Sequence, residues 1–354
     1  MIKVVVVDDS AFMRKAISTM LAKDPEIEVV AMARNGEEGL EMIRKHDPHV
    51  VTLDIEMPKM DGLTALKHIM MEMPRPVLMV SSLTTEGAEA TLKAMEYGAV
   101  DFIPKQLSKV SLDIVKIEDD LRKKVKIVAK RKMRPQPTRV SRSREKRTEP
   151  ARRKVVEFRK KGRQLRDVVA IGVSTGGPPV VQRILSELPE NFPAGILIAQ
   201  HMPKAFTGPF ARRLNESCQL EVREAGERDV LKPGKVFVSP GGKHLTIEQK
   251  VSRIDVVVSD EPQDALYRPS VNVLMSSVGR AVGARGVGVI LTGMGNDGQI
   301  GIRELKERGG KALAQSEETC VVYGMPKAIV DEGLADGIVS LEEMAKEIAA
   351  SLYN

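Results

Sequence analysis

The chain has 354 residues, of which 42% are hydrophobic, and this length and composition suit two or three globular domains. It contains no tryptophan and only 3% aromatic residues, which leaves little material for nucleic-acid recognition by base stacking. Its two cysteines, Cys218 and Cys320, have no metal-binding spacing, so we expect two thiols in a reducing compartment and neither a disulfide nor a zinc site.

The first ten residues, MIKVVVVDDS, contain a short apolar run that is ended by two aspartates. This pattern is typical of a first β-strand and not of a signal peptide. No later stretch approaches the run of about 18 apolar residues that a transmembrane helix needs. We therefore expect a soluble, cytoplasmic protein without a transmembrane segment.

The net charge of +7 is concentrated in one segment. Residues 122–166 contain 21 Lys or Arg against three Glu, a net charge of +18, which leaves −11 for the rest of the chain. This segment has few large apolar residues, so we interpret 123–166 as a basic linker between two domains, 1–122 and 167–354. A solvated tether, docking onto an acidic partner or an anionic membrane, and binding of nucleic acid all remain compatible with the charge.

Apolar runs alternate with helical patterns through the first domain. Five of these runs are rich in Val, Ile and Leu without polar alternation, which predicts strands covered on both faces. The runs are residues 4–7, 28–33, 50–54, 76–82 and 100–105. Such strands form a parallel, doubly wound α/β sheet, in which ligands bind at the carboxyl ends of the strands.

Polar residues lie at the carboxyl ends of four of these strands. They are Asp8, Asp9, Asp54, Ser81 and Lys105. Three carboxylates at one edge repel each other unless a cation lies among them, and hard oxygen ligands suit Mg²⁺. A nearby lysine can pair with an added phosphoryl group, and a hydroxyl can bond to its oxygens. The pattern predicts phosphoryl transfer to a carboxylate, with Asp54 as the nucleophile.

The motifs VVDDS, LDIEMPKMDG, MVSS and GAVDFIPK resemble those of response-regulator receiver domains, which have a flavodoxin-like fold. The resemblance implies that Asp54 is the phosphorylation site and that Asp8 and Asp9 hold Mg²⁺ together with it. It also implies that Ser81 and Lys105 contact the phosphoryl group. The first domain is therefore expected to be a phosphorylated switch.

The resemblance also places an aromatic switch in this domain. Phe102 occupies the switch position, and phosphorylation is expected to draw Ser81 toward the phosphoryl oxygens while Phe102 moves inward. One position departs from the family pattern, because Gln106 follows Lys105 where proline is usual. A cis peptide bond is costly without proline, so the cis bond of the family is not carried over to this position.

A second α/β pattern begins at Asp167. Its strands are predicted at residues 168–173, 195–200 and 286–293, with 235–247 and 253–259 as an antiparallel pair. The uninterrupted apolar runs indicate another buried parallel sheet. The pattern predicts a second doubly wound domain, Rossmann-like, with a β-hairpin insertion.

The stretch GVSTG, residues 172–176, has the sequence form of a nucleophile elbow, in which a serine stands at a strand-to-helix turn. A helix-capping serine would look similar. The interpretation of Ser174 as a nucleophile is favoured because His201 and Asp297 also follow predicted strands. In one parallel sheet the three residues share an edge, where they could form an activated nucleophile. The other histidine of this domain, His244, is interpreted as a surface or core residue of the hairpin region.

The stretch LTGMGNDG, residues 291–298, also fits the dinucleotide fingerprint G-x-G-x-x-G, with Glu317 and Glu318 about 20 residues further on. A carboxylate at Asp297 would repel the pyrophosphate that such a loop cradles. We therefore interpret the stretch as part of a hydrolase and not of an oxidoreductase. Its glycines permit a tight turn that leaves the backbone N–H of Met294 free to face an oxyanion.

The motifs GVSTGGP, QHMP, VSPGGKHL, YRPSVNVL, LTGMGNDG and YGMP resemble the catalytic domain of the chemotaxis protein-glutamate methylesterase family, CheB. A receiver joined to this domain is the architecture of that family. The resemblance implies hydrolysis of glutamate γ-methyl esters, and often deamidation of glutamines, on the cytoplasmic domains of chemoreceptors. It implies a chemotaxis histidine kinase as the phosphodonor and no cofactor for ester hydrolysis.

The same resemblance implies roles for individual residues and a mode of regulation. His201 would deprotonate Ser174, Asp297 would orient the imidazole, and the backbone N–H of Met294 would help to bind the oxyanion. The receiver would cover the catalytic edge until Asp54 is phosphorylated. The alternative from another class is a non-enzymatic response regulator whose basic linker binds nucleic acid or membrane; we expect the enzyme and no specific nucleic-acid partner.

Overall fold

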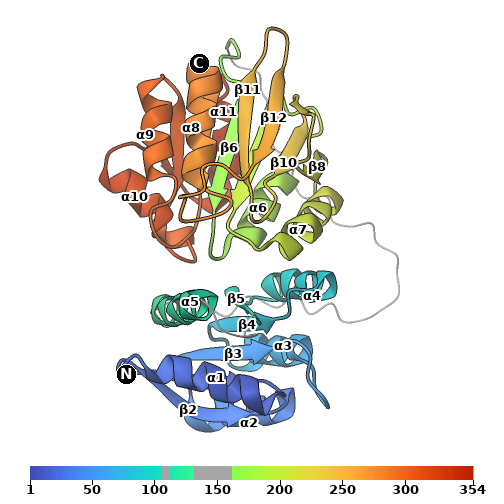
Figure 1. The fold of residues 1–354 in the computed structure, drawn as a ribbon, viewed down its shortest axis with the longest axis vertical. Coiled ribbons are helices and arrows are strands. Elements are labelled where there is room, and N and C mark those ends of the chain that lie inside the picture. The colour runs from blue at the N-terminus through green and yellow to red at the C-terminus, as the bar shows by residue number, and fades with distance from the viewer. Residues whose placement is uncertain (106–111, 131–161, 354) are drawn as a thin grey trace. The chain divides into compact units, whose positions relative to one another are not determined.

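The structure is a computed structural model that describes residues 1–105, 112–130 and 162–353, shown in Figure 1. The chain divides into two units, Met1–Arg147 and Thr148–Asn354, each with its own parallel sheet. The Lys105–Gln106 peptide bond and residues 131–161 of the predicted basic linker lie outside the described residues. No helix in the described ranges is long and apolar enough to cross a membrane.

The first unit is built on five parallel strands in the order β2-β1-β3-β4-β5. The strands are β1 (Ile2–Val7), β2 (Ile27–Ala33), β3 (Val50–Asp54), β4 (Val77–Ser81) and β5 (Asp101–Pro104). The helices are α1 (Ala11–Ala22), α2 (Gly36–His46), α3 (Gly62–Glu72), α4 (Thr85–Glu96) and α5 (Leu112–Val128). The valines of β1 are wholly buried, as expected of a sheet covered on both faces, and the doubly wound prediction is confirmed.

Side-chain caps begin the first four helices of this unit close to the carboxyl edge of the sheet. Ser10, Asn35, Asp61 and Thr84 each accept a hydrogen bond from a backbone N–H in the first turn of the helix that follows. The start of α3 packs so closely on β3 that a Cβ at Gly62 would lie 1.9 Å from the carbonyl oxygen of Asp54. The caps and this contact hold the loops around the strand ends in place.

The second unit is built on seven parallel strands in the order β15-β14-β13-β6-β7-β10-β8. The strands are β6 (Val168–Val173), β7 (Gly195–Gln200), β8 (Glu221–Glu224), β10 (Lys235–Val238), β13 (Gly286–Ile290), β14 (Lys311–Gln315) and β15 (Gly337–Val339). The helices are α6 (Gly177–Glu187), α7 (Lys204–Ser217), α8 (Val271–Val282), α9 (Gln299–Glu307), α10 (Met325–Asp331) and α11 (Leu341–Ala350). The unit also contains two short 3₁₀ turns, η1 (Gly283–Arg285) and η2 (Glu317–Thr319). The parallel sheet with its helices confirms the predicted α/β class.

A small antiparallel sheet, in the order β11-β12-β9, lies beside α8. Its strands are β9 (Asp229–Leu231), β11 (His244–Gln249) and β12 (Ile254–Ser259). The prediction that 235–247 forms a single antiparallel strand is wrong. Residues Lys235–Val238 form β10, which pairs in parallel with β7 and β8 in the large sheet. The chain turns at Gly242, where φ is +82°, so only the segment beyond it pairs with β12.

One apolar core joins the large sheet, α8 and the small sheet. Phe237 from β10, Leu245 from β11 and Leu274 from α8 are all buried in it. Helices α8 and α9 pack side by side (Figure 1), so closely that a Cβ at Gly301 of α9 would lie 2.5 Å from the carbonyl oxygen of Asn272. The core therefore fixes the start of α8 against the strands whose carboxyl ends carry the candidate site residues.

This core generates a stability prediction. Phe237→Ala removes a fully buried ring and leaves a cavity, so the melting temperature of the second unit should fall by roughly 6–20 °C. Calorimetry of the full chain measures it, with Val251→Ala as the control because Val251 is fully exposed in the β11–β12 turn. Equal shifts for the two variants would contradict the assignment of Phe237 to the core.

Candidate active site

Three of the predicted site residues meet at the carboxyl edge of the large sheet. Ser174 follows β6, His201 follows β7, and Asp297 lies between β13 and α9, while β6 lies between β7 and β13 in the sheet. The His201 Nδ1 atom is 3.1 Å from Ser174 Oγ, and its Nε2 atom is 2.8 Å from Asp297 Oδ2. The structure thus brings together a hydroxyl, an imidazole and a carboxylate in one hydrogen-bonded chain.

The Asp297 carboxylate lies buried at the N-terminus of α8. Its Oδ1 accepts hydrogen bonds from Ser270 Oγ (3.0 Å) and the Asn272 N–H (2.9 Å), and its Oδ2 accepts one from the Val271 N–H (2.7 Å). Burial alone would raise the pKa of Asp297, but the bonds from His201 and these N–H groups hold it below its ordinary value. The ionised carboxylate therefore accepts from Nε2–H, which leaves the Nδ1 lone pair facing the serine.

The turn that carries Ser174 is tight and tied to the neighbouring strand. The Ser174 N–H donates to the Thr292 carbonyl (3.0 Å), and the Gly177 N–H donates to the Ser174 carbonyl (2.9 Å). The N-cap of α6 is Gly176, at φ +73°, and no side chain caps this helix. The alternative that Ser174 is a capping serine is therefore wrong, and its hydroxyl is directed to His201 instead.

The loop after β13 passes close to Ser174. A Cβ at Gly293 would lie 2.8 Å from the Cβ of Ser174, so only glycine permits this approach. The Gly293 N–H donates to the Val322 carbonyl (3.0 Å). For the next residue, Met294, no atom among the described residues accepts a hydrogen bond from the backbone N–H. That N–H, in a loop that approaches Ser174, is consequently left without an acceptor among the described residues.

The same loop does not form a dinucleotide cradle. The N–H groups of Gly298 and Gly301, at the start of α9, donate to the Asn272 side-chain oxygen at 2.9 and 3.0 Å. These are donors that a pyrophosphate would need, and the preceding residue, Asp297, carries a carboxylate that bonds to His201. Glu317 and Glu318 are exposed on η2. The G-x-G-x-x-G spacing therefore arises from packing and turn geometry.

Sequence reasoning missed two side chains of this site. Gln200 is buried, and its Nε2 donates to the carbonyls of both Ser174 (3.0 Å) and His201 (3.3 Å). The ring of Tyr267 stacks on the imidazole of His201. The position of Gln200 at a strand end, directly before His201, could have identified it as a residue of the site. Tyr267 begins the motif YRPSVNVL, but that motif does not indicate a contact with His201, which lies 66 residues earlier in the chain.

His244 is a fully buried core residue that supports the site indirectly. Its Nδ1 accepts a hydrogen bond from the Ser270 N–H (3.2 Å), and its Nε2–H donates to the Pro262 carbonyl (3.2 Å). Burial lowers the pKa of His244, against the raising effect of the bond to Pro262. The neutral ring therefore holds Ser270, which in turn bonds to Asp297.

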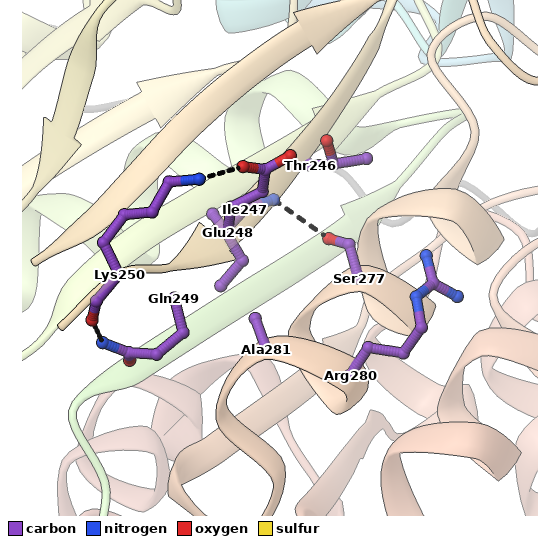
Figure 2. Close-up of a pocket in the computed structure, with 8 residues that line it drawn as sticks. All are labelled: Thr246, Ile247, Glu248, Gln249, Lys250, Ser277, Arg280 and Ala281. Atoms are coloured by element: carbon purple, nitrogen blue, oxygen red, sulfur yellow. Dashed lines mark hydrogen bonds and ion pairs between the residues drawn. The ribbon is translucent and has the colours of Figure 1, made fainter.

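A concavity that is separate from this site lies between β11 and α8 (Figure 2). It is lined by Thr246, Ile247, Glu248, Gln249, Lys250, Ser277, Arg280 and Ala281. Its polar groups bond to each other or to neighbours: the Ile247 N–H donates to Ser277 Oγ, and Lys250 pairs with Glu248. It contains no histidine and no nucleophile paired with a base, so it is not a competing active site.

The carboxylates of the first unit form a compact cluster. Asp8, Asp9 and Asp54 each offer an oxygen within 4.8 Å of the others, and Lys105 Nζ lies 2.6 Å from Asp54 Oδ2. Burial, with the charge of Asp8 added, raises the pKa of Asp54 to about 6 despite the neighbouring Lys105. The buried Oδ2 of Asp8 has no hydrogen-bond partner among the described residues. Lys105 Nζ lies 3.5 Å from this oxygen, so one ammonium group faces three carboxylates. A cluster of oxygen ligands with this surplus of negative charge fits a hard divalent cation such as Mg²⁺.

The two switch residues are placed differently from each other. The Ser81 hydroxyl lies 3.1 Å from the Gly87 carbonyl and 2.6 Å from the Thr91 hydroxyl of α4, so it is bonded away from the carboxylate cluster. Phe102 is only 6% exposed, and Lys124 Nζ lies 5.7 Å from the centre of its ring. The ring is thus already buried in this conformation, and its inward movement on phosphorylation stays a prediction.

Comparisons with known proteins match both units. The family model described as CheB methylesterase matches residues 169–348, and the response regulator receiver domain matches residues 4–115. The chain is 65% identical, over the whole of both chains, to protein-glutamate methylesterase/protein-glutamine glutaminase 2 of Nitratidesulfovibrio vulgaris. It is 55% identical, again over both whole chains, to the protein-glutamate methylesterase/protein-glutamine glutaminase of Lawsonia intracellularis.

A solved structure agrees with these matches. The crystal structure of the Thermotoga maritima CheB methylesterase catalytic domain is 36% identical, with a TM-score of 0.51. The match covers 52% of this chain and 98% of that one. The second unit alone thus accounts for that whole domain. The chain belongs to the CheB methylesterase family, in which it joins a response-regulator receiver to this catalytic domain.

Proposed function

We propose that this protein hydrolyses glutamate γ-methyl esters, and deamidates glutamines, on the cytoplasmic domains of chemoreceptors. The hydrogen-bonded chain from Ser174 through His201 to Asp297 carries the proposal, because it is an arrangement that activates a serine for attack on an acyl carbon. The names of the two relatives with whole-chain matches, which include both activities, support it. Ester and carboxamide present the same planar acyl group, so one site serves both reactions.

In the first step the Nδ1 atom of His201 takes the proton of Ser174, and Oγ attacks the acyl carbon. Asp297 stabilises the imidazolium that forms, and the Met294 N–H donates to the developing oxyanion. The imidazolium then gives its proton to the leaving methoxide or amine, which departs as methanol or ammonia. The glutamyl group remains as an ester of Ser174.

In the second step water releases the glutamate side chain. His201 deprotonates a water molecule, whose oxygen attacks the acyl-enzyme, and the Met294 N–H again faces the oxyanion. The proton returns to Ser174 Oγ as the ester bond breaks. The product is the glutamic acid side chain, which releases a proton to solvent and becomes a carboxylate, and the enzyme returns to its starting state.

The receiver unit supplies regulation in this proposal. Asp54 accepts a phosphoryl group from a chemotaxis histidine kinase. Asp8, Asp9 and Asp54 would hold Mg²⁺, which would offset the negative charge of the carboxylates and of the incoming phosphoryl group. Lys105 pairs with the phosphoryl group. The receiver restricts access of receptors to the catalytic edge, and phosphorylation relieves the restriction. The alternative of a non-enzymatic regulator is not favoured, since residues 169–348 match the CheB methylesterase family and Ser174, His201 and Asp297 form one hydrogen-bonded chain.

The nucleophile is tested by Ser174→Ala. Without the hydroxyl no acyl-enzyme can form, so methanol release from methylated receptor should fall to no more than a few per cent of the wild-type rate. Phosphorylation of Asp54 should be unaffected. Ser217→Ala, at the end of α7 and outside the site, is the matched control. A higher residual rate in Ser174→Ala would remove this serine from the role of nucleophile.

Regulation is tested by comparing four proteins. Phosphorylated wild-type protein and a fragment beginning at residue 167 should demethylate receptors roughly 10- to 150-fold faster than unphosphorylated protein, the range of a modest coupling free energy. Asp54→Asn should stay at the unphosphorylated rate when a phosphodonor is added. Asp47→Asn, at an exposed aspartate, should respond like wild type. Equal rates in wild type with and without phosphodonor, and in the fragment, would contradict restriction by the receiver.

The buried His244 predicts a pH dependence of stability. Because its pKa is lowered by burial, the unfolded chain binds a proton that the folded chain excludes. The free energy of unfolding should therefore be highest above the ordinary histidine pKa of about 6.5 and should fall as the pH drops below it. In His244→Asn, the carboxamide oxygen can replace Nδ1 as acceptor, and part of this slope should vanish.

The measurement is chemical unfolding of both proteins between about pH 5 and 8, the range in which histidine changes charge. His68→Asn serves as the control, because His68 is partly exposed and lies on α3 of the other unit. An unchanged slope in His244→Asn would show that His244 does not couple protonation to folding.

A further inference from the structure

The phenol ring of Tyr267 covers one face of the His201 imidazole. The ring centroids are 4.3 Å apart, and the ring planes differ by 12°, which is a stacked arrangement. The hydrogen bonds to Ser174 and Asp297 act at the edge of the imidazole, through its two nitrogens. They restrain tilting of the ring out of its plane only weakly, because hydrogen bonds tolerate moderate bending. A flat contact on the face supplies the missing restraint.

Tyr267 is held in this place by the segment to which it belongs. The carbonyl of the next residue, Arg268, accepts a hydrogen bond from the Gly242 N–H (3.1 Å). Two residues later, the Ser270 N–H donates to His244 Nδ1 (3.2 Å). Residues 270–272 then donate to the Asp297 carboxylate. One anchored segment therefore sets both the face contact of the imidazole and the position of its carboxylate partner.

The tyrosine also reaches the loop beside the serine. Its hydroxyl lies 3.5 Å from the position that a Cβ would take at Gly295, next to Met294. The side chain therefore spans from His201 to the loop whose backbone faces the acyl group in the proposed reaction. A side chain in this place can keep the base and that loop at a constant separation.

The stack also acts differently on the two charge states of His201. The face of an aromatic ring carries partial negative charge, so it attracts a cation more strongly than a neutral ring. The imidazole is neutral before attack and becomes cationic as it takes the serine proton. Because the extra attraction arises only as the reaction proceeds, it lowers the barrier and not merely the energy of the bound substrate.

We infer that Tyr267 is a positioning residue for the hydrolysis, whose ring fixes the plane of the His201 imidazole between Ser174 and Asp297 and favours the imidazolium. The inference rests on the proposed function. It concerns the ring and not the hydroxyl, because the stacked face is what contacts His201. It therefore predicts that phenylalanine can replace Tyr267 and that an aliphatic side chain cannot.

The test measures demethylation of methylated receptor by phosphorylated full-length variants. Tyr267→Leu should lower kcat about 10-fold, equivalent to about 1.4 kcal/mol, with KM within about twofold of wild type. Tyr267→Phe should stay within about twofold of wild type in both constants. Tyr353→Leu, which removes a tyrosine paired with Gln164 elsewhere in the unit, is the matched control and should resemble wild type. Thermal unfolding confirms folding, and Tyr267→Met replaces Tyr267→Leu if that variant does not fold.

A second readout separates positioning from receptor docking. Sulfonylation of Ser174 by phenylmethylsulfonyl fluoride needs the base but no receptor, and it should slow about 10-fold in Tyr267→Leu and not in Tyr267→Phe. Wild-type kinetics in Tyr267→Leu, a change in KM alone, or an equal loss in Tyr267→Phe would each overturn the inference. Failure of the proposed function is distinguishable, because wild-type protein would then release no methanol at all.

Discussion

The carboxylate of Asp297 is buried, and three donors from the first turn of α8 and its cap surround it together with the His201 imidazole. A buried charge without partners would be prohibitively costly, so these donors are a condition for its presence. They also decide its protonation state, because the bonds and the positive end of the helix favour the ionised form. The ionised form then determines which imidazole nitrogen carries the proton and leaves the other for Ser174. The chemistry of the site depends on this one buried carboxylate.

Both units use the same geometric property of parallel sheets for different chemistry. Carboxyl ends of neighbouring strands meet, so residues far apart in the chain become neighbours; Asp297 lies 96 residues from His201 along the sequence. In the second unit the edge collects a hydroxyl, a base and a carboxylate. In the first unit it collects three carboxylates and one lysine, Lys105, which pairs with both Asp54 and Asp8, so the cluster keeps a surplus of negative charge.

Ser81 and Lys105 of the first unit already make hydrogen bonds that phosphorylation of Asp54 would have to replace. The Ser81 hydroxyl bonds to Gly87 and Thr91 of α4, and the Lys105 ammonium bonds to Asp54. On the proposed function, a phosphoryl group on Asp54 offers new acceptors to both. Because Ser81 is buried, no water can bridge its hydroxyl to a second partner, so the hydroxyl bonds either to α4 or to the phosphoryl group. Switching is then an exchange of hydrogen bonds between α4 and the phosphorylated aspartate, with Phe102 already buried before it begins.

The sequence by itself determined the two α/β units, the buried strands and the residues at their carboxyl ends, because apolar runs and strand-end positions are local properties. It therefore predicted that Ser174, His201 and Asp297 share an edge. It did not determine how Lys235–Val238 pairs, and the hairpin prediction was wrong there, since strand partners are chosen by burial against distant elements. Only the tertiary structure decided that the start of α8 binds Asp297 and that Tyr267 covers the imidazole. Those contacts depend on where α8 packs, and no local pattern encodes that position.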